Sequence, residues 1–263
     1  MPTARNFLTR GLLAGLIAGL VAFGVARVVG EPSLDSAISL EESGSSVHAE
    51  VATGSTKASM DAGAGTTVVP RDLQSTLGLL TGTVVIGLAL GGLMGVMTAV
   101  FIGRLGRVSP RATALAVAAA GFVVVCLVPF LIYPPNPPGI GDATSIDTRS
   151  SLYFALLAIS TLCAGLAGFL GTRLRTRIGG WYASLVGIGG YVVAMCVAAQ
   201  CLPTYDYVGT GYPAQLLFQF RLGSLLTQAA LWATIGVVLA ELTHRLVGPP
   251  LHLQRGLEHS VRT

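Results

Sequence analysis

The sequence contains little charge. Lys and Arg number 16 and Asp and Glu 12 among 263 residues, so charged residues make up 11% of the chain, whereas about 25% is usual in soluble domains. All of these residues except Arg27 and Glu241 fall outside six apolar stretches. The shortage excludes a water-soluble globular protein and indicates membrane spans joined by polar connections.

Motifs for nucleotide, proton or zinc chemistry are also missing. A phosphate-binding loop needs Gly-Lys-Ser/Thr, and the one lysine of the chain, Lys57, has no such setting. No acidic residue lies near the middle of an apolar stretch, where proton-coupled carriers usually keep a carboxylate. The four histidines form no His-Glu-x-x-His motif. We therefore expect neither an enzyme nor a permanently bound cofactor.

Cysteine is scarce, and its positions exclude a disulfide framework. The four cysteines all fall in apolar stretches, and no two are spaced as Cys-x-x-Cys. No cluster of cysteine and histidine has the spacing of a zinc site either. The residues in question are Cys126, Cys163, Cys196 and Cys201.

Long apolar runs, by contrast, are abundant. A bilayer core of about 30 Å needs about 20 residues of helix, and six runs reach that length: 11–29, 77–103, 112–133, 152–171, 181–202 and 222–242. The sequence predicts an all-α protein, a polytopic membrane helix bundle of six transmembrane helices. For the first run a signal peptide is the alternative, because Arg5 and Arg10 precede it and Gly24-Val25-Ala26 offers a cleavage site.

The signs of the charges predict the orientation. With a cytoplasmic N-terminus, the inner connections hold 11 basic and 2 acidic residues, a net charge of +9, and the outer ones hold 5 basic and 10 acidic residues, a net charge of −5. Basic residues favour the cytoplasmic side, so we expect both termini there. This asymmetry accounts for the pI of about 9.1 without nucleic acid as a partner.

The chain is expected to divide into four parts. Residues 1–29 form the cytoplasmic N-terminus and the first span, and residues 77–247 form a membrane bundle of five spans. Between them, residues 30–76 form an outer loop that is largely disordered, since its few large apolar residues cannot build a core. Residues 248–263 form a cytoplasmic tail.

Glycines recur every four residues in the first two spans, which leaves one face of each helix without side chains. Close packing of helices is the usual use of such faces, and sliding or opening during transport is the alternative. The glycines are Gly11, Gly15, Gly19, Gly87, Gly91 and Gly95.

Polar residues form one stripe on the sixth span, at Arg221, Ser224 and Gln228. They either hydrogen-bond neighbouring helices and loops or line a solute path. In a path for cations, the charge of Arg221 would need an acid such as Asp206 or Glu31 to neutralise it.

Carboxylates and one histidine gather in the outer loop, at Glu41, Glu42, His48 and Glu50. Carboxylate and imidazole groups bind divalent ions of the first transition row, so this set is a candidate metal site. The alternative is a solvated loop in which these residues bind nothing.

Several segments resemble the CbtA family, the membrane subunit of predicted cobalt transporters. They are residues 10–16 leading into Gly30-Glu31-Pro32, residues 81–85, 109–113 and 220–224, and the proline-rich segment 129–138. The resemblance implies transport of Co²⁺ as substrate, in the setting of cobalamin synthesis, together with a small single-span, histidine-bearing partner, CbtB. Some relatives have several outer-loop histidines, whereas this loop has only His48. This departure from the family pattern implies that Glu31, the other carboxylates or the partner supply metal ligands.

Our hypothesis is a multi-pass subunit of a cobalt or divalent-metal uptake transporter in the bacterial inner membrane, in contact with the lipid bilayer. Outer acids would raise the local cation concentration, and the helix bundle would supply the path. The alternatives are a permease for another small cation and a non-transporting assembly or scaffold subunit whose glycine faces bind another membrane protein.

Overall fold

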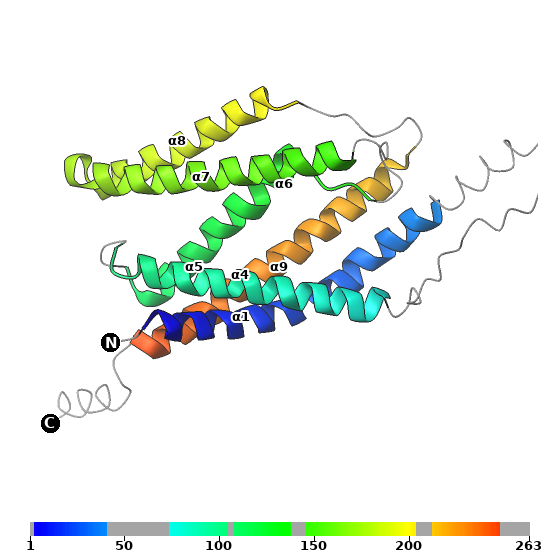
Figure 1. Cartoon of the computed structure of the whole chain (residues 1–263), viewed down its shortest axis with the longest axis horizontal. Helices are drawn as coiled ribbons and strands as arrows, with labels where there is room; N and C mark the ends of the chain where they lie inside the picture. Colours follow the sequence, from blue (N-terminus) through cyan, green and yellow to red (C-terminus); the bar gives the residue numbers. More distant parts are fainter. Residues whose placement is uncertain (1–2, 41–73, 105–107, 138–145, 204–211, 248–263) are drawn as a thin grey trace, which may run out of the picture. The chain divides into compact units, whose positions relative to one another are not determined.

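The six predicted spans are present as helices in the computed structural model, which describes residues 3–40, 74–104, 108–137, 146–203 and 212–247 (Figure 1). Within these residues there is no strand, so the all-α prediction is confirmed. Among the described residues, six helices are long and apolar enough to cross a membrane, and they span Ala4–Leu40, Thr76–Phe101, Pro110–Ile132, Asp147–Ile178, Gly180–Cys201 and Ala214–Val247.

The first helix is longer than its apolar run. It comprises α1 (Ala4–Val25), the π-helical segment η1 (Ala26–Gly30) and helical residues 31–40. The start of the outer loop, expected at residue 30, is therefore helical. At 1.5 Å per residue, the 37 residues of this helix measure about 55 Å and exceed the hydrocarbon core of a bilayer. Residues 41–73 of the loop and the tail lie outside the described residues.

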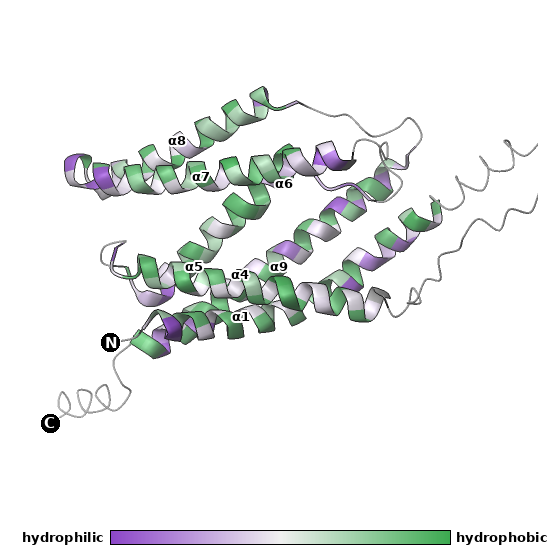
Figure 2. Cartoon of the chain, in the orientation of Figure 1, coloured by the Kyte–Doolittle hydropathy of each residue, from purple (hydrophilic) through white to green (hydrophobic). Residues whose placement is uncertain are grey.

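The fourth span also extends beyond its apolar run. Helix α7 (Ile146–Ile178) ends next to α8 (Gly180–Cys201), with only Gly179 between them, at φ 82°. Arg175 and Arg177 lie in the last turn of α7, so the basic connection expected here is mostly helix. Figure 2 shows hydrophilic residues at both ends of α7 and mostly apolar residues along its middle. The sequence placed the apolar core of this helix correctly and its ends too far inward.

The helices fall into two compact units. One contains Met1–Val25, Val69–Ala120 and Thr227–Thr263, and the other contains Ala26–Val68 and Gly121–Leu226. In the first unit α1 packs along α4 (Leu79–Phe101), which follows the π-helical segment η2 (Gln74–Gly78). In the second unit α7 packs along α8 (Figure 1).

Backbone contacts between glycines hold α1 against α4. A Cβ atom built on Gly91 would lie 2.5 Å from the Cα atom of Gly15, and one built on Gly95 would lie 3.0 Å from the Cα atom of Gly11. A Cβ atom on Gly15 would overlap the carbonyl oxygen of Gly87. Contacts this short leave no room for any side chain. Both four-residue glycine series thus meet at one helix contact, the usual packing of small residues in membranes.

The third span is built from three segments. Helix α5 (Pro110–Gly121) is followed by the π-helical segment η3 (Phe122–Leu127) and by α6 (Val128–Ile132). The segments η1 and η3 each end two residues before a proline, Pro32 and Pro129. Proline lacks the N–H that would continue the hydrogen-bond ladder. Single π-helical turns inside α-helices frequently occur at functional sites.

Candidate functional site

A buried carboxylate lies just beyond η1. Glu31 is 6% exposed, although glutamate is almost never fully buried without a partner. Its Oε2 lies 3.9 Å from Nη1 of Arg27, one helical turn earlier. Ser33, also buried, donates its hydroxyl to the carbonyl oxygen of Gly30 at 2.8 Å. Of the acids expected to bind metal, Glu31 is the one that the described residues include.

The start of α9 (Ala214–Val247) approaches this turn closely. A Cβ atom built on Gly223 would lie 3.1 Å from the carbonyl oxygen of Val29 and 3.4 Å from the Cα atom of Gly30. At Gly223 the backbone of α9 therefore lies close to the backbone of η1. A larger residue there would push α9 away from the backbone that carries Glu31.

Arg221, two residues before this contact, binds the proline-rich segment. Its Nη2 donates to Oδ1 of Asn136 at 2.8 Å, and its Nε donates to the carbonyl oxygen of Pro135 at 3.4 Å. The segment is also held at its start, where the hydroxyl of Tyr133 donates to the carbonyl oxygen of Pro203 at 2.7 Å. These bonds join the ends of α6, α8 and α9, which favours the structural interpretation of Arg221 over a path-lining one.

The other residues of the polar stripe do not join this cluster. Ser224 donates its hydroxyl to the carbonyl oxygen of Phe220 within α9, at 2.9 Å. Gln228 is half-buried one turn further on. The helical spacing placed the three residues on one face, but only Arg221 reaches another part of the chain through the hydrogen bonds that the structure gives for these three.

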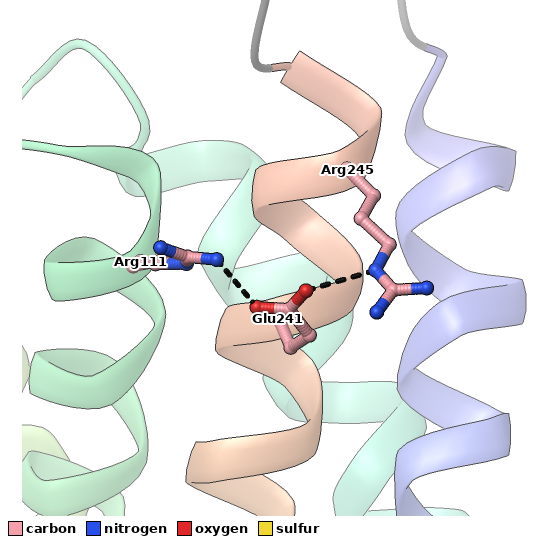
Figure 3. A network of polar contacts seen from close by, with 3 residues as sticks. All are labelled: Arg111, Glu241 and Arg245. Carbon is pink, nitrogen blue, oxygen red and sulfur yellow. Dashed lines mark hydrogen bonds and ion pairs between the residues drawn. The ribbon is translucent and has the colours of Figure 1, made fainter. Parts of the chain in front are cut away.

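A second charged cluster lies in the other unit (Figure 3). Glu241 on α9 accepts from Nη2 of Arg111 on α5 at 2.7 Å and from Nε of Arg245, one turn later, at 2.8 Å. The side chains are exposed, so we assign the cluster to positioning the two helix ends. Sequence reasoning missed the contact between Arg111 and Glu241, because 130 residues separate them.

The comparison with protein families decides what kind of protein this is. The model of the CbtA family, described as a probable cobalt transporter subunit, matches residues 4–244. The chain belongs to the CbtA family. The match covers five membrane-spanning helices completely and the sixth except for its last three residues, and it confirms the resemblance of the sequence segments. No curated protein and no solved structure gives a significant match to the chain.

Membership in the CbtA family makes the chain a subunit of a transporter, which implies partner subunits, and its six apolar helices make it a multi-pass membrane protein. Within the part of this CbtA chain that the structure describes, no three His, Cys, Asp or Glu residues gather as a metal site. Glu41, Glu42, His48 and Glu50 fall outside the described residues. Of the expected metal ligands in this CbtA protein, Glu31 is therefore the one whose surroundings the structure describes.

Proposed function

We propose that this CbtA-family chain is the membrane subunit of an uptake transporter that carries Co²⁺ across the bacterial inner membrane. The family match over residues 4–244 carries the proposal, because it reaches all six helices and the family is described as a probable cobalt transporter subunit. Co²⁺ is the substrate of this transport, and the chain itself performs no catalysis.

Glu31 is the residue that we assign to metal binding first. Glu31 is only 6% exposed, and buried charges in proteins are usually paired or bound to metal ions. It follows a π-helical segment, and interrupted helices supply free backbone oxygens beside ion sites in transporters. The outer-loop residues Glu41, Glu42, His48 and Glu50 begin ten residues later in the chain. Together with Glu31 they offer carboxylate and imidazole ligands of the kind that Co²⁺ accepts.

A second subunit is expected to complete the metal site. One outer-loop histidine supplies little imidazole, the ligand that suits first-row divalent ions. A small, single-span, histidine-bearing subunit of the CbtB type would add the missing nitrogen ligands. The chain also has no nucleotide-binding loop, so a partner or an ion gradient supplies the energy.

Orientation is the first testable part of this proposal. Six spans would return the chain to the side on which it started, and the net charges of +9 and −5 favour cytoplasmic termini. A cytoplasm-active reporter fused after Thr263 is expected to be active, and the same reporter inserted between Gly54 and Ser55 is expected to be silent. The reverse pattern would refute the orientation and the direction of transport with it.

Cobalt uptake is the second testable part. Cells that express the gene are expected to accumulate more cobalt at trace supply than cells that lack it, as measured by mass spectrometry of washed cells. Nickel and zinc in parallel cultures distinguish a cobalt transporter from a permease for another cation. Equal cobalt contents would favour the alternative of a non-transporting assembly subunit, which should still co-purify with its neighbouring membrane proteins.

A further inference from the structure

The third span contains a backbone carbonyl that its own helix cannot satisfy. In η3 the backbone hydrogen bonds span five residues, and the bond at its end runs from the N–H of Val128 to the carbonyl oxygen of Val123. At the same spacing, the carbonyl oxygen of Val124 would accept the N–H of residue 129. Residue 129 is proline, which has no N–H. The ladder is therefore interrupted at Val124.

A hydroxyl group from α7 takes the place of the missing N–H. Oγ of Ser160 lies 2.7 Å from the carbonyl oxygen of Val124 and 2.8 Å from the hydroxyl oxygen of Tyr191 on α8. A serine hydroxyl has one proton and a carbonyl only accepts, so Ser160 donates to Val124 and Tyr191 donates to Ser160. The three residues form one directed chain of hydrogen bonds between three spans.

This series of hydrogen bonds lies in the middle of the helices that it joins. Ser160 is fully buried, at 0% exposure, near the middle of α7, and Tyr191 lies near the middle of α8. Water is absent from the hydrocarbon core, so a carbonyl released there has to find a partner inside the protein. Prolines and π-helical turns are both known causes of sharp bends in helices, and both occur here within eight residues, between Phe122 and Pro129.

We propose that Ser160 and Tyr191 form a hydrogen-bond bridge at the point where Pro129 interrupts the backbone hydrogen bonds of the third span. We also propose that the span bends at this point during transport. The bridge can open without breaking the α-helical hydrogen bonds of α5 or α6. The bending part rests on the proposed transport function, whereas the bridge itself does not. Ser160 is thus a positioning residue that acts through the backbone of Val124.

A double-mutant cycle on the full chain in detergent tests the bridge. Ser160→Ala is expected to lower the midpoint of thermal unfolding by about 3 °C, since it leaves a buried carbonyl without a donor. In the Pro129→Ala background, residue 129 supplies its own N–H, and Ser160→Ala is expected to cost less than about 1 °C. Equal losses in both backgrounds would overturn the bridge.

Thr161 provides the matched control on the same helix. Its hydroxyl donates to the carbonyl oxygen of Leu157 within α7, at 2.8 Å, and the residue is exposed. Thr161→Val removes a hydroxyl next to Ser160 without releasing a carbonyl from the ladder. It is expected to leave the unfolding midpoint unchanged in both backgrounds. A loss as large as that of Ser160→Ala would count against the bridge.

Uptake by the Pro129→Ala variant tests the bending. A continuous third span is expected to be at least as stable as the native one, yet to take up cobalt at least about fivefold more slowly, because it resists the conformational step. Native uptake by this variant, at a native expression level, would overturn the bending part. If even the unmodified protein takes up no cobalt, the proposed function fails, and the unfolding cycle still decides on the bridge.

Discussion

Replacing Gly91 with leucine is expected to separate α1 from α4 and to prevent stable folding. A Cβ atom at this position would lie 2.5 Å from the Cα atom and 2.6 Å from the nitrogen atom of Gly15. Both are backbone atoms, which cannot turn aside as a flexible side chain can. We expect the midpoint of thermal unfolding in detergent to fall by about 10 °C or more, or the protein to be lost from the membrane fraction.

Two other glycines of the same helices serve as controls. Nothing lies within 4 Å of a Cβ atom built on Gly82 of α4 or on Gly24 in the first helix. Gly82→Leu and Gly24→Leu are therefore expected to fold normally, and the better helix propensity of leucine adds slightly to stability. If Gly82→Leu proves as damaging as Gly91→Leu, the damage comes from the leucine itself and not from the contact with α1.

Replacing Glu31 with glutamine is expected to lower cobalt uptake at trace supply by at least about tenfold, since the change removes a charged ligand. Glutamine keeps the shape of the side chain, so the packing between η1 and Gly223 is retained. Uptake is measured by mass spectrometry of washed cells at matched expression. The purified variant should unfold within about 2 °C of the native protein, because Arg27 stands 3.9 Å from the carboxylate and remains 47% exposed to water, and the amide of glutamine can still form hydrogen bonds.

Asp35→Asn is the matched control for Glu31→Gln. Asp35 lies one turn later on the same helix, and its side chain is exposed. The change in charge is the same, so a general loss of attraction for cations would reduce uptake in both variants. We expect uptake to fall only in Glu31→Gln. Native uptake by Glu31→Gln would exclude Glu31 from the metal path and leave the ligands to the outer loop and a partner subunit.

Local patterns were sufficient to predict most of the fold. Each of the six apolar runs lies within a helix of the structure apart from a few end residues, because a helix in lipid must satisfy its backbone groups and exclude charge along its own length. Helix ends were predicted less well. Residues 31–40 were assigned to a loop because they follow the apolar run in a segment with few large apolar residues, yet a helix continues easily beyond the lipid, where polar groups meet water.

The candidate site could be predicted only in part. The spacing of Gly11, Gly15 and Gly91 indicated a bare helix face, but the partner of each face depends on how the helices associate. The stripe containing Arg221 indicated a polar surface, whereas its acceptor on Asn136 lies 85 residues away. The prolines that follow η1 and η3 were visible in the sequence. Their effect on the hydrogen-bond ladder was not, since proline also occurs in regular helix starts.

The sequence by itself determined the number of membrane-spanning helices, their approximate positions and the family, because hydropathy, length and local motifs are properties of contiguous residues. Only the tertiary structure decided which glycines touch, that Arg221 holds the proline-rich segment and that Ser160 satisfies the carbonyl oxygen of Val124. These contacts join residues far apart in the chain. Their geometry follows from how close the helix backbones come, a quantity that no single segment specifies.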